Sequence, residues 1–167
     1  MTAQPATLTG LVADANVLID YAGAGLSVIG VIARHLAPVY IPSPILEEVT
    51  QVFREQIEQL SCEVIEPTLA QASEAAGEPG SVSFQDRLCL IVARDARWQV
   101  LTNDKSLRSA CGEVEVRCVW GLEAMALAVE AGHLSHKRAV TVAEKISAAN
   151  RFITPAIVAQ FRRRIGS

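Results

Sequence analysis

The sequence predicts an α/β fold, a three-layer α/β/α sandwich with a parallel central sheet. Short apolar runs, which are typical of buried strands, alternate along the chain with longer segments of helical periodicity. Strands that alternate with helices pair in parallel through right-handed crossovers. Half of the 167 residues are apolar and 20% are charged, so the chain can form the core of one such domain.

Five short runs are expected to form the strands of this sheet. They are rich in Val, Ile and Leu, and some of them end at an acidic residue or a proline. In chain order, the expected strands are Leu11 to Ala13, Val39 to Ile41, Glu63 to Glu66, Gln99 to Leu101 and Val114 to Val119.

The helices of the first half follow from apolar patterns and from capping residues. Residues 26–36 are apolar on nearly all sides, which is typical of a buried helix. Ser43 and Pro44 supply an N-cap and a first-turn proline for the next helix. Its apolar face is expected to carry Ile45, Leu46, Val49 and Phe53.

The middle of the chain adds three more helices. Residues 68–76 are helical by propensity. A segment that begins at Phe84 repeats apolar residues at the spacing of an amphipathic helix. Residues 121–131 form a helix that is expected to end at Gly132.

The last residues of the chain predict a separate helical extension. Two helices are expected, at Lys137 to Ala149 and at Pro155 to Ile165, the second one capped by Thr154. We therefore divide the chain into a domain at residues 1–132 and a C-terminal helical extension at residues 133–167. The extension is expected to pack on the domain or to lie at an interface.

Four acidic residues stand where a strand has just ended or a helix has just begun: Asp14, Glu48, Asp86 and Asp104. In a parallel sheet these positions share one edge, the edge at which ligands bind. A cluster of carboxylates without a basic partner is typical of a site for Mg²⁺ or Mn²⁺, which prefer oxygen ligands. We therefore expect the four side chains to meet in one pocket and to form a metal-dependent catalytic site.

Helical geometry favours Glu48 over its neighbour Glu47 as a member of this site. At about 100° per residue, Glu47 points away from an apolar face that is centred near Ile45 and Val49. Glu48 lies at the border of that face, where a residue that lines a cleft belongs.

Each acid also has a purely structural interpretation. Asp14 and Asp104 could cap the turn or the helix that follows them, and Ser83 with Asp86 fits a capping box. Glu48 could be an ordinary helix acid that the helix dipole stabilises. Convergence of the four at one edge is what favours a functional site over independent caps.

Composition and motifs limit the classes of function. The net charge of −3 and a pI near 5.6 do not indicate a strongly cationic nucleic-acid binder, so a nuclease would need a metal or a local basic surface. The sequence contains no Gly-rich phosphate loop and no GxSxG elbow. Asn16 stands two positions after Asp14, which disfavours a phosphatase with a phospho-aspartate. Without a recognisable signal sequence or an apolar run of membrane-spanning length, we expect a cytoplasmic protein and no membrane partner.

Four segments, ADANVLID, IPSPILEEV, QDRLCLIVARD and VLTNDKSLR, together resemble a PIN domain over roughly residues 11–119. The resemblance implies four catalytic acids, Asp14, Glu48, Asp86 and Asp104, of which Asp14, Asp86 and Asp104 bind the metal. It also implies supporting polar residues in the Asp-x-Asn and Thr-Asn-Asp settings, which are Asn16, Thr102 and Asn103.

The resemblance implies that residues 1–132 form a Mg²⁺- or Mn²⁺-dependent endoribonuclease domain that cleaves single-stranded RNA. It further implies a homodimer and, as in the toxins of toxin–antitoxin pairs, a small antitoxin protein as partner. Two alternatives stay open. One is a catalytically silent PIN-like binding module whose acids serve as caps, and the other is a metal-dependent nuclease that acts on DNA.

Overall fold

The computed structural model describes residues 7–77 and 80–166, so the first six residues of the predicted domain lie outside it. In this part of the chain, five parallel strands form one sheet in the order β3-β2-β1-β4-β5, and the predicted parallel sheet is confirmed. The strands are β1 (Leu11–Ala13), β2 (Val39–Pro42), β3 (Glu63–Ile65), β4 (Gln99–Leu101) and β5 (Cys118–Val119).

The central position of β1 creates the switch point of the sheet. The chain continues from β1 outward to β2 and β3, and then returns to the other side of β1 to form β4 and β5. All three residues of β1 have no exposed surface, because strands and helices cover it on every side. Ligands of parallel α/β sheets bind beyond the carboxyl ends of the strands at such a switch point, which here lies between β1 and β4.

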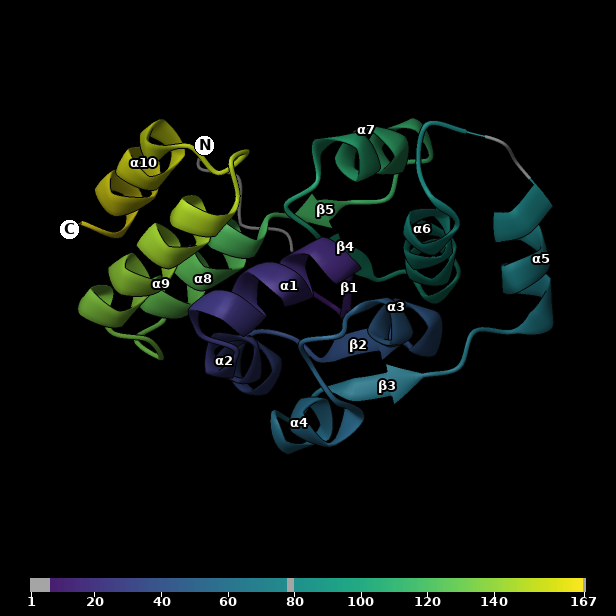
Figure 1. Cartoon of the computed structure of the whole chain (residues 1–167), viewed down its shortest axis with the longest axis horizontal. Helices are drawn as coiled ribbons and strands as arrows, with labels where there is room; N and C mark the ends of the chain where they lie inside the picture. The colour runs from purple at the N-terminus through teal and green to yellow at the C-terminus, as the bar shows by residue number, and fades with distance from the viewer. Residues whose placement is uncertain (1–6, 78–79, 167) are drawn as a thin grey trace.

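Helices cover the two faces of the sheet and give the three-layer arrangement (Figure 1). In one layer α6 packs on β1 and β4, with α5 and α7 against it; these helices are α5 (Leu69–Gly77), α6 (Phe84–Ala96) and α7 (Lys105–Glu113). The other layer contains α1 (Ala15–Ala24), α2 (Ser27–His35), α8 (Gly121–Glu130) and α9 (His136–Ala149). Two short helices, α3 (Ser43–Glu48) and α4 (Arg54–Gln59), lie near β2 and β3.

The C-terminal helices pack on the rest of the chain. The long helix α9 contacts α1, and α10 (Pro155–Ile165) contacts α8 and α9 (Figure 1). Thr154 caps α10 by accepting a hydrogen bond from the backbone of Ile157. Val142 and Ile146 of α9 and Phe161 of α10 belong to the same hydrophobic core as the sheet.

Two local predictions are wrong. The helix that begins at Ser43 does not reach Phe53: it ends at Glu48, Val49 is extended, and Phe53 precedes the separate helix α4 with 67% of its surface exposed. The predicted strand at residues 114–119 shrinks to its last two residues. Glu115 has a φ of 58°, and this left-handed backbone interrupts an extended run.

The helix α1 is an element that periodicity does not predict, because its residues are mostly apolar or small on all sides. No single helix in the described part of the chain is long and apolar enough to cross a membrane. By length and composition alone, α1 and α2 could do so as a pair, but they are bent by 119° at the break between them.

Candidate active site

Asp14 stands at the carboxyl end of β1 and is fully buried. It is the N-cap of α1, since its Oδ1 accepts a hydrogen bond of 2.8 Å from the backbone N–H of Val17. The other carboxylate oxygen accepts a hydrogen bond from the hydroxyl of Thr102. The cap that the sequence allows is therefore present, and the same side chain lies at the switch point of the sheet.

Thr102 connects two of the predicted acids. It follows β4, is fully buried, and donates from Oγ1 to Asp14. The same oxygen accepts a hydrogen bond of 2.9 Å from the backbone N–H of Asp104. Asp104 in turn caps α7 through a hydrogen bond of 2.8 Å from Leu107 N–H to its Oδ1. One hydroxyl thus fixes the relative positions of the acids that follow β1 and β4.

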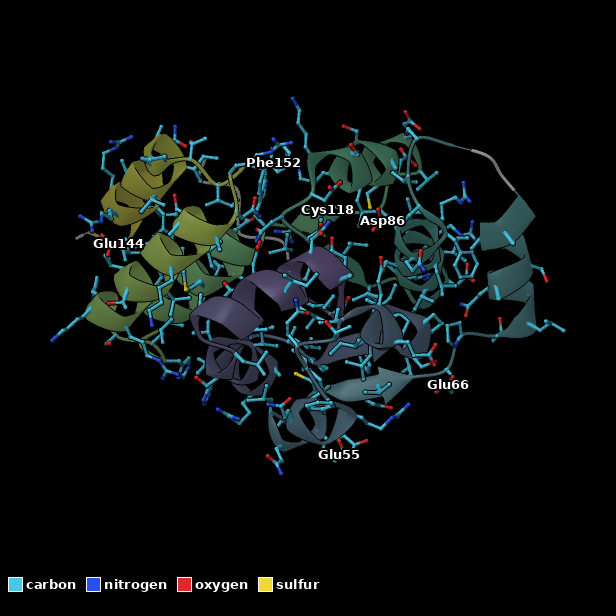
Figure 2. All side chains as sticks on the ribbon, viewed as in Figure 1. Glu55, Glu66, Asp86, Cys118, Glu144 and Phe152 are labelled. Carbon is cyan, nitrogen blue, oxygen red and sulfur yellow. The ribbon has the colours of Figure 1, made fainter. Side chains whose placement is uncertain are left out.

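Asp86 enters the site from the first turn of α6, where Ser83 is the N-cap and accepts from the Asp86 backbone N–H at 3.1 Å. Figure 2 shows Asp86 between α6 and α7. Glu48 is the exposed last residue of α3. Burial raises the pKa of Asp86, and the negative charges of Asp104 and Glu48 raise it further, while hydrogen bonds with Ser83 act in the opposite direction. The acids on three separate helices therefore repel one another.

Asp14 experiences the same repulsion in a more buried position. Burial raises its pKa to about 7, the charges of Asp86 and Asp104 add to the increase, and the hydrogen bonds from Thr102 and Val17 oppose it. The nearby thiol of Cys89 experiences the same negative charges. Its pKa is raised by burial and by the charges of Asp14, Asp86 and Glu48. The structure thus brings all four predicted acids within electrostatic range of one another.

No Lys or Arg in the described part of the chain forms an ion pair with any of these four carboxylates. Among the same residues, no three His, Cys, Asp or Glu side chains are placed so that they could jointly hold a metal ion. The donor set is nevertheless all oxygen, and its members repel one another. By its chemistry this set fits a hard divalent cation, and binding would require the carboxylates to turn toward a common point.

The two asparagines that the sequence predicts as supporting residues, Asn103 and Asn16, differ in burial and in hydrogen bonding. Asn103 is buried, donates from Nδ2 to Asp20 at 2.9 Å and accepts from the backbone N–H of Gly121 at 2.9 Å. Asn16 is exposed and lines a cleft beside Asp104. Asp20 also accepts two hydrogen bonds from Asn150, at 3.0 and 3.2 Å.

The sequence prediction does not include the residues of the extension that line this cleft. They are Asn150, Arg151 and Phe152 of the loop between α9 and α10, together with Ala149 of α9 and Ile157 of α10. An aromatic residue in a polar loop between two amphipathic helices was the available signal. It is weak, because single exposed apolar residues are common on protein surfaces.

The comparisons with known proteins bear on the fold. The chain is similar to a PilT N-terminus domain protein from the hyperthermophilic archaeon Sulfolobus solfataricus P2, with a TM-score of 0.54 and 12% sequence identity. The similarity covers 73% of this chain and 95% of that one. The fold is PIN-like. No family model and no curated protein matches the sequence. This likeness concerns the fold alone. In this chain Asp14 and Asp104 follow β1 and β4, at the carboxyl ends of two neighbouring strands.

Proposed function

We propose that the protein is a Mg²⁺- or Mn²⁺-dependent nuclease that hydrolyses phosphodiester bonds of single-stranded RNA. One observation carries the proposal: Asp14, Glu48, Asp86 and Asp104 lie within electrostatic range of one another near the switch point of a PIN-like sheet, and no Lys or Arg of the described residues pairs with them. Unpaired carboxylates that repel one another are costly for the folded state and suit a divalent cation.

The residues divide the work by position. Asp14, Asp86 and Asp104 would hold the metal, which when bound supplies a polarised phosphate and a more acidic water. Thr102 keeps Asp14 and Asp104 in register through its single hydroxyl. Glu48 is exposed at the rim, so its carboxylate is free to orient the attacking water and to accept its proton.

The binding-module alternative explains the caps but not the whole arrangement. Caps at Asp14 and Asp104 are present, as that alternative requires. A cap, however, needs neither full burial of Asp14 nor the approach of Asp86 to it, both of which raise the free energy of the charged state. Cleavage of RNA rather than DNA, a homodimer and an antitoxin stay predictions from the resemblance.

A cleavage assay tests the proposal with a matched pair of variants. Labelled single-stranded RNA and DNA of the same sequence are incubated with the protein and with Mg²⁺, Mn²⁺ or a chelator. Asp14→Asn keeps a capping side chain and is expected to lower the rate at least about 100-fold. Asp95→Asn changes an exposed acid on α6 that is paired with Arg94 and is expected to leave the rate unchanged.

Three results would contradict the proposal. Equal cleavage by Asp14→Asn would indicate another nuclease in the preparation. Preference for DNA would support the second alternative. Absence of cleavage with either metal, in a sample that melts cooperatively, would favour the binding module.

A further inference from the structure

A cleft of about 820 Å³ adjoins the acidic site and separates the domain from the loop between α9 and α10. Asn16 and Ile19 of α1 and Lys105 at the start of α7 line one side of it, and Arg151 and Phe152 line the other. Asp104 belongs both to this cleft and to the group of mutually repelling acids. The cleft is therefore continuous with the proposed catalytic site.

The loop that carries Phe152 is held in place by a partly buried network of hydrogen bonds. Asn150 accepts a hydrogen bond of 3.0 Å from the backbone N–H of Phe152 and donates to the carboxylate of Asp20. Asp20 also binds Asn103, the neighbour of Asp104. One buried carboxylate thus fixes the acid-bearing loop and the Phe152 loop relative to each other. Ile153, fully buried next to Phe152, anchors the loop in the core.

The ring of Phe152 is 70% exposed although its backbone is fixed. Figure 2 labels it in the loop between α9 and α10. The guanidinium of Arg151 lies over this ring at 4.9 Å from the centroid. A second such pair adjoins the cleft: Trp120 lines it, and the guanidinium of Arg108, which lies outside the lining, is 4.1 Å above the ring centroid of Trp120. Two aromatic faces and two cations therefore flank the acids.

Two cations line the cleft, Lys105 and Arg151, and a third, Arg108, lies beside it on Trp120. In residues 7–77 and 80–166, none of the three forms an ion pair. Arg162 and Arg164 of α10 differ from them, because they pair with Glu144 and Glu130. In a chain of net charge −3, Lys105 and Arg151 thus place cations without an ion partner among the described residues in the cleft, beside its two acids Asp20 and Asp104.

We propose that this cleft binds the single-stranded stretch of nucleic acid next to the cleaved bond. A base stacks on Phe152, and Arg151, Lys105 and Arg108 contact the phosphates. Exposed aromatic rings beside cations are how proteins hold single strands, because every base has a face that can stack. The inference rests on the proposed function for its orientation toward the acids. It gives the C-terminal helices a role as the substrate-binding wall of the site.

The test measures binding without cleavage. Fluorescence anisotropy follows a labelled oligoadenylate RNA of about 12 nucleotides that is titrated with the full chain in a chelator. Phe152→Ala is expected to weaken binding about tenfold, and Phe152→Trp to retain it, since a larger ring still stacks. Phe53→Ala is the matched control, because it removes an equally exposed ring near α4, and its affinity should equal that of the wild type. Melting temperatures verify that each variant folds.

Salt dependence tests the cations separately. Arg151→Ala should reduce the slope of the logarithm of the binding constant against the logarithm of salt concentration by about 0.7, the value for one phosphate contact on a single strand.

Equal binding of Phe152→Ala and wild type, equally tight binding of a duplex, or no RNA binding by the wild type would each overturn the inference. If Phe152→Ala loses binding but the wild type cleaves nothing with Mn²⁺, the inference survives while the proposed function fails. If Asp14-dependent cleavage occurs and Phe152→Ala binds and cleaves normally, the proposed function survives while the inference about the cleft fails.

Discussion

Asp86 and Asp95 lie on the same helix, α6, and their carboxylates meet opposite surroundings. Asp95 is exposed, and hydrogen bonds from Gln71 and Arg94 lower its pKa. Asp86 is partly buried and faces Asp104 and Glu48, so its pKa is raised. On this one helix, Asp95 accepts hydrogen bonds from neighbouring donors, whereas Asp86 lies among other acids.

The difference extends to the rest of the surface. Several acids outside the site are paired with arginines, as in Glu74 with Arg94 and Glu130 with Arg164. Such exposed pairs add little to stability, about 0–1 kcal/mol each. Among the described residues, ion pairs thus neutralise some exposed acids, where this matters little, and none of the four acids at the switch point, where the repulsion is costly. This pattern is expected of a site that is completed by a cation.

The largest expected effect concerns the pH dependence of stability without metal. Folding raises the pKa of Asp14 from 3.8 to about 7, so the folded state binds this proton more tightly than the unfolded state. The resulting stability is complete below about pH 4 and is lost as pH rises through about 7, a change of about 4 kcal/mol. Asp14→Asn stays neutral, so urea unfolding in a chelator should show a flatter dependence of its free energy of unfolding on pH. Parallel curves for the variant and the wild type would contradict this.

The neighbours Glu47 and Glu48 also allow an acid of the site to be compared with one outside it, here on one short helix. Both are exposed on α3, but only Glu48 acts on the pKa values of Asp86 and Cys89. Glu48→Gln is expected to lower metal-dependent cleavage about 100-fold, and Glu47→Gln to leave it within about twofold of wild type. Rates of RNA cleavage measure both. Equal losses would show that position on the helix does not decide which acid serves the site.

Asp20 is a buried acid that has found neutral donors instead of cations. Burial raises its pKa, and the amides of Asn103 and Asn150 oppose the increase. Asn150→Ala removes two of its hydrogen bonds and is expected to lower the free energy of unfolding by about 1–3 kcal/mol. Asn16→Ala, at an exposed position of the same cleft, serves as the control in the same denaturation experiment. An unaffected Asn150→Ala would mean that the network does not hold the loop.

The smallest expected effect is a change in stability, which should have opposite signs when Asp86 and Asp95 are replaced by Asn. Asp86→Asn removes a repelling charge, so it should raise the melting temperature of the metal-free protein at neutral pH. Asp95→Asn weakens an exposed pair and should lower stability by less than about 1 kcal/mol. Thermal melting of the two variants in a chelator measures both changes. The same sign for both would remove the distinction between the two acids.

Much of the fold and of the acidic edge could be predicted, because local signals place them. Asp14 and Asp104 follow apolar strands, and Asp86 follows a helix cap, so the sequence alone assigns them to one edge. The prediction of Glu48 depended only on a helix that runs from Ser43 to residue 48. The observed helix does so, although it ends at Glu48 and does not continue to Phe53.

The rest depends on tertiary contacts. The hydrogen bond between Asn150 and Asp20 joins residues 130 positions apart and exists only because α9 packs on α1. Helical periodicity says which face of α9 is apolar, but it does not say which helix that face meets. The exposure of Phe152 follows from this packing, so the cleft could not be derived from the pattern of the chain.

Calorimetric titration of Mn²⁺ into the metal-free protein near pH 7 measures whether the four acids form a cation site. If the four acids form a cation site, binding is saturable and releases protons, because Asp14 is partly protonated at this pH and must ionise to bind the metal. Titration in two buffers with different ionisation enthalpies measures that release. We expect Asp14→Asn to lose both binding and proton release, and Asp95→Asn to keep them. The absence of saturable binding, or binding that Asp14→Asn leaves unchanged, would contradict it.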